Sequence, residues 1–423
     1  MKILLLGSGG REHTFAWKMA QSPLCEKIYI APGNAGTAAL GENTPLDIMD
    51  NSAIHDFVVE KNIDMVVVGP EAPLVNGVWN YLRRMRSTSH VTVIGPSMQG
   101  ARLEGSKSYA KKFMKEYGIP TAAYREFFAA RSQAAINYIY KKATTPIVLK
   151  ADGLAAGKGV VISPTKEEAE AEIRSMLSGK FGEASRKVVI EQFLSGIEFS
   201  VFVLTDGQSY KILPVAKDYK RVGEGDTGPN TGGMGAVSPP PFVDAAMMEK
   251  VEERIIKPTI RGLQDRGIHY QGFIFLGLIR VNNEPYVIEY NCRMGDPETE
   301  VVLPRLKNDL VELFVAIKEG RLDKVKIEEE EQAAATVVLT SGGYPGQYEK
   351  GKTITGLDQV KGSTVFHAGT KSADGKTVTN GGRVMAITSL GKTFKAALKK
   401  SNKNAEKVEF DGKNYRKDIG FDL

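Results

Sequence analysis

The sequence predicts an α/β protein in which a doubly wound parallel domain comes first and a small β-rich domain comes last. In the first hundred residues, short apolar runs alternate with helical patterns, and each run ends in a turn rich in Gly or Pro. Beyond the acidic run EEEEQ, the chain continues as a Gly-rich tail of β type. Apolar runs of four to six residues separated by helices are typical of a parallel sheet that is covered on both faces.

The expected strands of the first domain are KILLLG, KIYIAPG, MVVVGPE and VTVIGPS, and the helical patterns between them include EHTFAWKMAQS and SAIHDFVVEKN. A further helix is expected from Ser106, and it ends at Gly118 and Pro120. Ligands of a doubly wound sheet bind at the carboxyl ends of its strands. We therefore expect a site at the Gly-rich turns that follow these strands.

The middle of the chain changes pattern. Residues 121–190 read as a small α/β segment in which strands PIVLKAD and GVVIS flank a Gly-rich loop, and strand KVVIEQFL follows. An antiparallel hairpin is expected around the turn Asp206-Gly207, then a long helix over 244–264 and two strands, GFIFLGLIRV and PYVIEYN. The acidic run EEEEQ is expected to mark a domain junction.

Composition excludes several classes of protein. A chain of 423 residues is expected to form two to four domains. Its two cysteines and five scattered histidines predict neither a disulfide framework nor a zinc site. Met1-Lys2 leads directly into ILLLG without the pattern of a signal peptide, and no apolar run has transmembrane length, so we expect a cytoplasmic protein. The mild net charge of +6 favours anionic small molecules over nucleic acid.

The Gly-rich loop in VLKADGLAAGKGVVI, residues 148–162, is not a P-loop. Gly153 to Gly157 is one residue too short, and Gly159 stands where the Mg²⁺-binding hydroxyl should be. The loop lies between two strands, whereas a P-loop leads from a strand into a helix. We therefore interpret it as a flap that covers phosphates, with Lys150 on the preceding strand as the source of positive charge. The alternative is a plain hairpin with an incidental lysine.

The segment VIEYNCRMGDPETE, residues 287–300, predicts a metal site. Glu289 and Asn291 are two apart on a strand, so both side chains point to one face. Two oxygen ligands suit Mg²⁺, which keeps waters and shares phosphate oxygens. Arg293 continues that face and is a candidate for stabilising a transferring phosphoryl group. The alternative is an ordinary exposed strand face.

Three other segments suggest binding groups. In VVIEQFLSGIEFS, residues 188–200, a strand ends at Glu191, and the Gln-Phe-Leu hinge after it could present backbone N–H and C=O groups to a planar base. Glu198 could reach a ribose hydroxyl, and an ordinary strand edge is the alternative. The long loop 217–241 offers charged groups and a run of backbone N–H groups in TGGMG. The turns GSGGREH, PGN and GPE end strands at one sheet edge, where a phosphoribosyl group could bind at the N-terminus of a helix. Tight structural turns are the alternative.

Taken together, these segments resemble the ATP-grasp ligases and, within them, the glycinamide ribonucleotide synthetase (phosphoribosylamine–glycine ligase) family. GSGGREH, KADGLAAGKGV, IEQFLSGIEFS, PNTGGMGA and EYNCRMGDPETE match the family pattern in order. The resemblance covers essentially the whole chain. It implies an ATP-grasp fold with a doubly wound pre-ATP-grasp domain over 1–104, a helical connection over 105–120, a mobile B-domain lid over 121–189, an A-domain over 190–326 and a C-domain over 327–423.

The resemblance also implies ATP and Mg²⁺ (or Mn²⁺) as cofactors, glycine and 5-phosphoribosylamine as substrates, and a monomer that binds neither nucleic acid nor membrane. Glu289 and Asn291 would hold the metal, and Arg293 would be catalytic. Residues implied for ATP are Lys107, Lys150, Gly153, Ala155, Ala156, Gly157, Lys158, Gly159, Val160, Glu191, Phe193, Leu194 and Glu198. Residues implied for the other substrates are Gly9, Gly10, Arg11, Asn34, Glu71, Asp218, Lys220, Gly233, Met234, Gly295 and Asp296.

The implied reaction joins glycine to 5-phosphoribosylamine, with release of ADP and phosphate, through a glycyl phosphate in purine biosynthesis. Three alternatives stay open at the level of sequence. A purine carboxylase that uses bicarbonate would share the fold, GSGG alone would suit a nicotinamide oxidoreductase, and a nucleotide-binding module would have no reaction.

Overall fold

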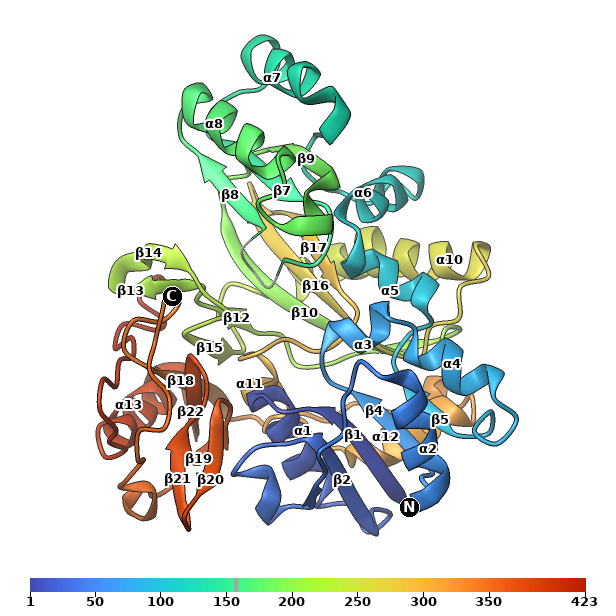
Figure 1. Ribbon diagram of the computed structural model, residues 1–423, viewed down its shortest axis with the longest axis vertical. Helices are drawn as coiled ribbons and strands as arrows, with labels where there is room; N and C mark the ends of the chain where they lie inside the picture. Colours follow the sequence, from blue (N-terminus) through green and yellow to red (C-terminus); the bar gives the residue numbers. More distant parts are fainter. Residues whose placement is uncertain (156–158) are drawn as a thin grey trace.

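The computed structural model describes residues 1–155 and 159–423, and it has four sheet-centred parts (Figure 1). A parallel N-terminal sheet and a C-terminal antiparallel sheet lie at the bottom of the view. A small green lid sheet lies at the top, and a central antiparallel sheet connects it to the rest. The predicted α/β architecture, with a doubly wound first domain and a small β-rich last domain, is therefore confirmed.

The N-terminal sheet has five parallel strands in the order β3-β2-β1-β4-β5. The chain moves outward from β1 in one direction and then returns to place β4 on its other side, so the turns after β1 and β4 meet at the switch point of the sheet. The strands are β1 (Lys2–Gly7), β2 (Lys27–Pro32), β3 (Glu42–Asn43), β4 (Met65–Val68) and β5 (Thr92–Ile94), and the helices are α1 (Gly10–Met19), α2 (Asn51–Lys61), α3 (Glu71–Val75) and α4 (Val78–Arg84).

Two helices connect the N-terminal sheet to the rest of the chain: α5 (Met98–Gly105) and α6 (Lys107–Glu116). The hydroxyl of Ser106 caps α6 by accepting the N–H of Tyr109 at 3.2 Å, as the predicted helix start at Ser106 requires. Apolar residues of α5 and α6 belong to a single core that runs from the N-terminal sheet into the central sheet. This shared core fixes the switch point of the first sheet against the central sheet.

The lid is a four-stranded antiparallel sheet in the order β6-β9-β7-β8, with two helices packed on it (Figure 1). Its strands are β6 (Tyr124–Phe128), β7 (Ile147–Ala151), β8 (Val160–Ser163) and β9 (Lys187–Gln192), and its helices are α7 (Ser132–Lys141) and α8 (Lys166–Leu177). Lys150 pairs with Val160 across β7 and β8, so the Gly-rich segment connects two antiparallel strands as predicted.

The central sheet has the order β11-β10-β16-β17, and the predicted hairpin around Asp206-Gly207 is its first pair. The bounds are β10 (Ile197–Thr205), β11 (Tyr210–Ile212), β16 (Gly272–Val281) and β17 (Glu284–Asn291). The expected long helix is α9 (Ala245–Val251) and α10 (Lys257–Asp265), joined by a π-helical segment, Glu252–Ile256. The short α11 (Thr299–Val302) and then α12 (Leu310–Lys318) follow β17.

The C-terminal sheet has the order β12-β15-β18-β22-β19. Its strands are β12 (Lys217–Asp218), β15 (Gly235–Ser238), β18 (Ala333–Thr340), β19 (Thr364–His367) and β22 (Arg383–Gly391), and α13 (Phe394–Ala405) packs on it. Two short hairpins accompany the sheet, β13 (Arg221–Gly223) with β14 (Thr227–Asn230) and β20 (Thr370–Ala373) with β21 (Lys376–Thr379). The expected domain limits stay predictions, but two strands of the expected A-domain, β12 and β15, lie in this sheet.

Candidate active site

Charged side chains converge where β17 ends. Glu289 and Asn291 lie among the last three residues of this strand, where they pair with Gly277 and Phe275 of β16, respectively. Burial alone would raise the pKa of Glu289, but Lys220, Lys150, Lys107 and Arg293 outweigh burial, so the pKa is lowered. The carboxylate of Glu289 is therefore charged at neutral pH and is surrounded by cations.

Glu191, at the end of lid strand β9, is shared by two buried lysines. Its Oε2 lies 2.8 Å from Nζ of Lys111 and 3.1 Å from Nζ of Lys150. Nζ of Lys150 also donates to the carbonyl of Ile288 at 3.0 Å, which ties the lid to β17. Within the described chain, the buried Oε1 of Glu191 has no hydrogen-bond partner. A buried acceptor without a partner fits a donor such as the exocyclic amine of adenine.

Sequence reasoning missed Lys111. Burial lowers the pKa of this lysine to about 8, although Glu191 opposes the change. Lys111 follows the predicted phosphate ligand Lys107 by four residues on α6, so both side chains lie on one face of the helix. That spacing was the signal that could have identified it.

The Gly-rich segment lies beside the start of α6. Nζ of Lys107 donates to the carbonyl of Gly153 at 3.2 Å, and the N–H of Ala151 donates to the carbonyl of Gly159 at 2.8 Å. Burial lowers the pKa of Lys107. The structure thus brings together Lys107, Lys150, Gly153, Ala155, Gly159 and Val160, whereas the predicted Ala156, Gly157 and Lys158 lie outside the described residues.

Acidic groups gather on the other side of Glu289. Glu198 of β10 pairs with Lys220 at 2.9 Å, and Lys220 lowers the pKa of Glu198. Burial raises the pKa of Asp218. Burial, and then Asp218, raises the pKa of Glu298 to about 8, so Glu298 can exchange a proton near neutral pH. Sequence reasoning assigned no role to Glu298.

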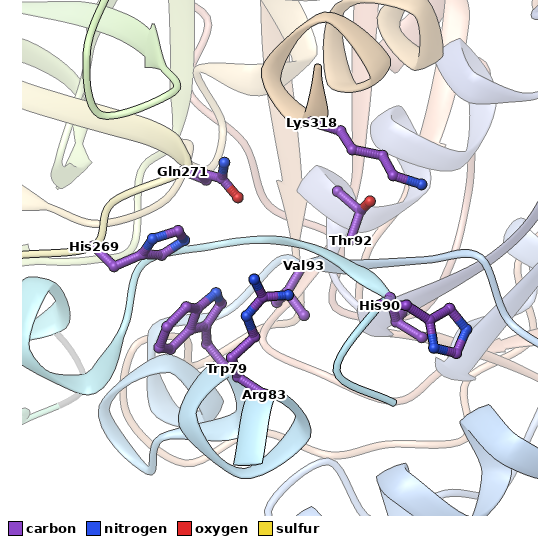
Figure 2. A pocket seen from close by; sticks show the side chains of 9 residues that line it. Trp79, Arg83, His90, Thr92, Val93, His269, Gln271 and Lys318 are labelled. Atoms are coloured by element: carbon purple, nitrogen blue, oxygen red, sulfur yellow. The ribbon is translucent and has the colours of Figure 1, made fainter. Parts of the chain in front are cut away.

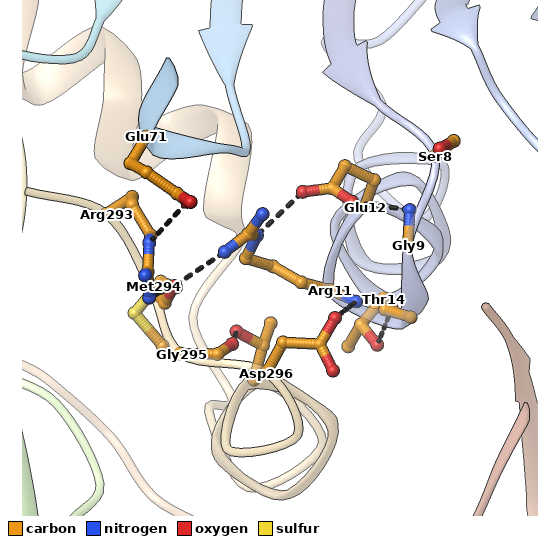
Figure 3. A network of polar contacts seen from close by, with 12 residues as sticks. Ser8, Gly9, Arg11, Glu12, Thr14, Glu71, Arg293, Met294, Gly295 and Asp296 are labelled. Carbon is orange, nitrogen blue, oxygen red and sulfur yellow. Dashed lines mark hydrogen bonds and ion pairs between the residues drawn. The ribbon is translucent and has the colours of Figure 1, made fainter. Parts of the chain in front are cut away.

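Arg293 is held by two carboxylates of the N-terminal domain. Its Nε lies 3.3 Å from Oε2 of Glu71 (Figure 3). Its Nη2 lies 2.7 Å from Oε1 of Glu104. Burial would lower the pKa of Arg293, but Glu104 and Glu71 raise it, so the guanidinium stays charged. The backbone N–H of Cys292 donates to the other oxygen of Glu104 at 2.7 Å. Glu104, which sequence reasoning missed, therefore fixes both Arg293 and the end of β17.

The turn after β1 binds carboxylates of the protein itself (Figure 3). The N–H of Gly9 donates to Oε2 of Glu12 at 2.6 Å, and the N–H of Arg11 donates to Oδ2 of Asp296 at 3.4 Å. A phosphate that used these two N–H groups would have to displace Glu12 and Asp296. The same contact weighs against a dinucleotide at this turn, because Glu12 occupies the helix terminus where a pyrophosphate binds.

Asn34 links the N-terminal domain to the C-terminal sheet. Its Nδ2 donates to the carbonyls of Ser8 and His367 at 2.9 and 2.8 Å, and its Oδ1 accepts the N–H of Gly36 at 2.9 Å. Beside it, Nδ1 of His13 accepts the N–H of His367 at 2.7 Å. The amide of Asn34 is thus already used within the protein, and its predicted contact with substrate stays a prediction.

The loop before β15 meets the turn after β17. Gly233 has φ +120°, and a Cβ there would collide with Cδ of Pro297. The predicted Met234 is a core residue whose N–H donates to the carbonyl of Tyr219 at 2.7 Å. Gly295 and Asp296 lie in the facing turn, where Oδ1 of Asp296 is 3.0 Å from Nη1 of Arg383 of the C-terminal sheet.

Gly10, at the start of α1, faces the carboxylate of Glu300, and burial followed by Asp296 raises the pKa of Glu300 well above its ordinary value. Phe193 and Leu194 lie half-buried in the short connection from β9 to β10, next to Glu191.

The helices of the described part are all too short or too polar to cross a membrane.

The predicted metal ligands, Glu289 and Asn291, lie at the end of β17. Over residues 1–155 and 159–423, no cluster of three or more His, Cys, Asp or Glu could hold a metal ion. The charged carboxylate of Glu289 and the buried amide of Asn291, whose Nδ2 finds no partner in the described chain, nevertheless offer two neighbouring oxygen ligands. Mg²⁺ completes such a small protein set with water and phosphate oxygens.

Family models cover the chain in three consecutive blocks. The N domain of phosphoribosylglycinamide synthetase matches residues 1–104, its ATP-grasp (A) domain matches 105–299, and its C domain matches 334–422. The chain belongs to the phosphoribosylglycinamide synthetase family. The A-domain model includes residues 121–192, the end of β17 and its acidic turn, so the residues described above, except Glu300, lie within the matched blocks.

Named relatives of the phosphoribosylglycinamide synthetase family align over the full length. The phosphoribosylamine–glycine ligases of Escherichia coli (strain K12) and Pasteurella multocida are 48% and 47% identical, over 100% of this chain and 98% of each relative. The crystal structure of the Thermotoga maritima phosphoribosylamine–glycine ligase has a TM-score of 0.83 at 38% identity, and the match covers 99% of this chain and 100% of that chain. A biotin carboxylase domain from Hydrogenobacter thermophilus shares the fold at 17% identity and a TM-score of 0.73.

Proposed function

We propose that this protein ligates glycine to 5-phosphoribosylamine at the expense of ATP, giving glycinamide ribonucleotide, ADP and phosphate. Relatives 46–48% identical over essentially the whole chain are named phosphoribosylamine–glycine ligase, which makes this a carbon–nitrogen ligase of purine biosynthesis. The expected monomer, the cytoplasmic location and the absence of a nucleic-acid partner stay predictions.

The observation that carries the proposal is the meeting of lid and central sheet at the end of β17. Lys150 and Lys107 flank Glu289 there, and the nearby Glu191 has a buried carboxylate oxygen without a partner in the described chain. Cations for phosphates, oxygen ligands for a metal and an acceptor for a purine amine therefore lie side by side. This set of groups suits a nucleoside triphosphate that is covered by the lid.

In the first half of the proposed reaction, an oxygen of the glycine carboxylate attacks the γ-phosphorus of ATP, the bond to ADP breaks, and glycyl phosphate forms. Lys107 and Lys150 bind the phosphates, and Glu191 with Leu194 orients the base, while Glu198 meets the ribose. Mg²⁺ or Mn²⁺ held by Glu289 and Asn291 would neutralise charge on the phosphate oxygens. Positioning and charge neutralisation of this kind account for most catalysis of phosphoryl transfer.

In the second half, the amine of phosphoribosylamine attacks the acyl carbon, phosphate leaves and the amide forms. The nitrogen must then lose a proton. Glu298 belongs to the acidic cluster beside Glu289 and has a pKa of about 8, so it is mostly protonated at pH 7 and its ionised fraction grows toward pH 8. We assign this ionised form as the proton acceptor. Arg293, fixed by Glu71 and Glu104, offers a charged guanidinium for the transferring phosphoryl group.

The test is ADP release by the purified protein with Mg-ATP, with glycine and in-situ phosphoribosylamine supplied separately and together. Release that needs both substrates supports the ligase. Release with bicarbonate in place of glycine would overturn the substrate assignment, and no release would overturn the activity.

A matched pair of variants localises the reaction on β17. Glu289→Gln removes the central carboxylate, whereas Glu284→Gln changes the same charge at the far end of the strand, where Glu284 pairs with Lys250 at 2.7 Å. We expect loss of ADP release in the first variant and retention in the second. Equal activity of the two variants would contradict the placement of the site.

A further inference from the structure

A small cavity lies away from the candidate active site, on the edge strand of the N-terminal sheet (Figure 2). It has a volume of about 170 Å³ and lies between the amino end of β5 and a segment that precedes β16. Its floor is formed by β5 and the residue before it, and α4 and α12 contribute side chains to its rim. The candidate active site lies instead at the end of β17, which meets the carboxyl ends of the strands of the N-terminal sheet.

The cavity is lined by basic groups. Arg83, His90, His269 and Lys318 contribute to it, and none of its lining residues is acidic. Throughout the described ranges, no carboxylate lies within ion-pair distance of these four side chains. Figure 2 shows the ammonium group of Lys318 and the guanidinium of Arg83 on either side of Thr92. The positive charges of Arg83 and Lys318 raise the local concentration of anionic ligands. Burial lowers the pKa of His269, so its imidazole contributes as a neutral hydrogen-bonding group.

Two polar atoms of the lining lack partners. The hydroxyl of Thr92 is buried, with its residue only 6% exposed, and its Oγ1 makes no hydrogen bond to any described residue. The same holds for Nε2 of His269, whose ring stacks on Trp79 with centroids 4.3 Å apart. Buried polar atoms without partners are rare in folded proteins, because each costs about 1–3 kcal/mol. A ligand that accepts hydrogen bonds would satisfy both.

We propose that this cavity is a second binding site, for the phosphate group of inorganic phosphate or of a small phosphate monoester. The lining offers a hydroxyl, an imidazole N–H, a side-chain amide, a guanidinium and an ammonium, which approach from several directions as the oxygens of a tetrahedral anion require. A volume of about 170 Å³ is below the range of about 300–1,000 Å³ typical of drug-sized ligands, so a whole nucleotide does not fit.

The cavity lies at the junction between β5 and segment 269–271, so a bound ligand would contact both. The N–H of Gly95 donates to the carbonyl of Gln271 at 2.8 Å, and the N–H of Ser97 donates to the carbonyl of His269 at 3.1 Å, so the segment 269–271 is docked on the end of β5. A phosphate group in the cavity would bridge Thr92 of the first sheet and His269 of this segment. Binding therefore stabilises the junction and raises the melting temperature as phosphate is added.

Tryptophan fluorescence offers a direct test. The chain has two tryptophans, and Trp79 lines the cavity whereas Trp17 packs against Phe366 of the C-terminal sheet. In a Trp17→Phe variant, the emission reports on Trp79 alone. Titration with inorganic phosphate, at constant ionic strength and with Mg-ADP saturating, should give a saturable change. A repeat with glycerol phosphate distinguishes the free ion from a monoester.

Matched variants complete the design. Arg83→Gln and Lys318→Gln should each weaken phosphate binding about tenfold or more, because each removes a charge-assisted hydrogen bond. Arg84→Gln makes the same change one residue along α4 at a side chain outside the lining, and it should bind as the parent does. Thr92→Val should abolish the phosphate-dependent rise in melting temperature without destabilising the phosphate-free protein.

Two results would overturn the proposal. One is a Trp79 emission that does not saturate with either phosphate compound, or that chloride reproduces. The other is equal weakening by Arg83→Gln and Arg84→Gln, which would indicate general screening of surface charge. Failure of the ligase assay would leave this test unaffected, because the fluorescence titration needs no turnover.

Discussion

Replacing Glu298 by Gln should make the protein more stable and less active. Burial and the neighbouring Asp218 raise the pKa of Glu298 from its ordinary value of 4.5 to about 8. A carboxyl group with a raised pKa in the folded state favours folding fully below pH 4.5, and that contribution is lost as the pH rises toward 8. Gln keeps the shape of the neutral acid but never ionises, so the variant avoids the loss.

The magnitude follows from the two pKa values. Each pH unit between 4.5 and about 8 costs the parent protein about 1.4 kcal/mol, which amounts to about 3 kcal/mol at pH 7. At pH 5 the same reasoning leaves less than about 1 kcal/mol. If Glu298 accepts the proton of the attacking amine, the substitution should also lower kcat by about 10²-fold or more. Stability gained at the expense of activity is typical of strained functional sites.

Urea denaturation followed by far-UV circular dichroism at pH 5, 6, 7 and 8 measures the stability difference, and ADP release measures kcat. The matched control is Glu331→Gln, the same substitution at an exposed carboxylate. A gain in stability that does not grow with pH would refute the raised pKa. Unchanged kcat alongside a growing gain would refute only the catalytic role.

Three other predictions follow from buried contacts. Glu191→Gln leaves two buried lysines without their shared carboxylate, so the free energy of unfolding should fall by about 3–5 kcal/mol in urea denaturation, and the KM for ATP should rise. Gly233→Ala should lower ADP release because its Cβ collides with Pro297, whereas Gly225→Ala, with φ +64° and open space, should retain it. Arg383→Lys loses bonds to both a carbonyl and a carboxylate across the junction, so kcat/KM for the amine substrate should fall about tenfold with the KM for ATP unchanged. An unchanged unfolding free energy would contradict the Glu191 prediction, and equal ADP release by the two glycine variants would contradict the second. A changed KM for ATP in Arg383→Lys would contradict the third.

The periodicity of the sequence predicted most of the fold. Apolar runs ending in Gly or Pro turns gave the parallel sheet, and the turn at Asp206-Gly207 gave the hairpin of β10 and β11. The pairing of β12 and β15 with the C-terminal sheet was not predicted. These strands are two and four residues long and lie in a Gly-rich loop. No alternation could therefore show that β12 pairs with β15, or that β15 pairs with β18, about a hundred residues later.

The site was predicted where motifs are local and missed where partners are distant. Glu289 and Asn291 could be predicted as neighbours from their spacing on one strand, and Lys150 could be predicted as a phosphate ligand from the Gly-rich loop beside it. Glu104 and Arg383 could not, because they reach Arg293 and Asp296 from other domains and belong to no recognisable motif. The spacing of residues also could not reveal that Glu12 would bind the N-terminus of its own helix.

The central claim is that the carboxylate of glycine receives the phosphoryl group of ATP. Glycine labelled with ¹⁸O in its carboxylate tests this most directly, with the released phosphate analysed by mass spectrometry after a single turnover. If glycyl phosphate forms and the amine displaces phosphate from its acyl carbon, one labelled oxygen must leave with the phosphate and the other must stay in the amide. Phosphate without label, produced alongside the ligated product, would contradict the account.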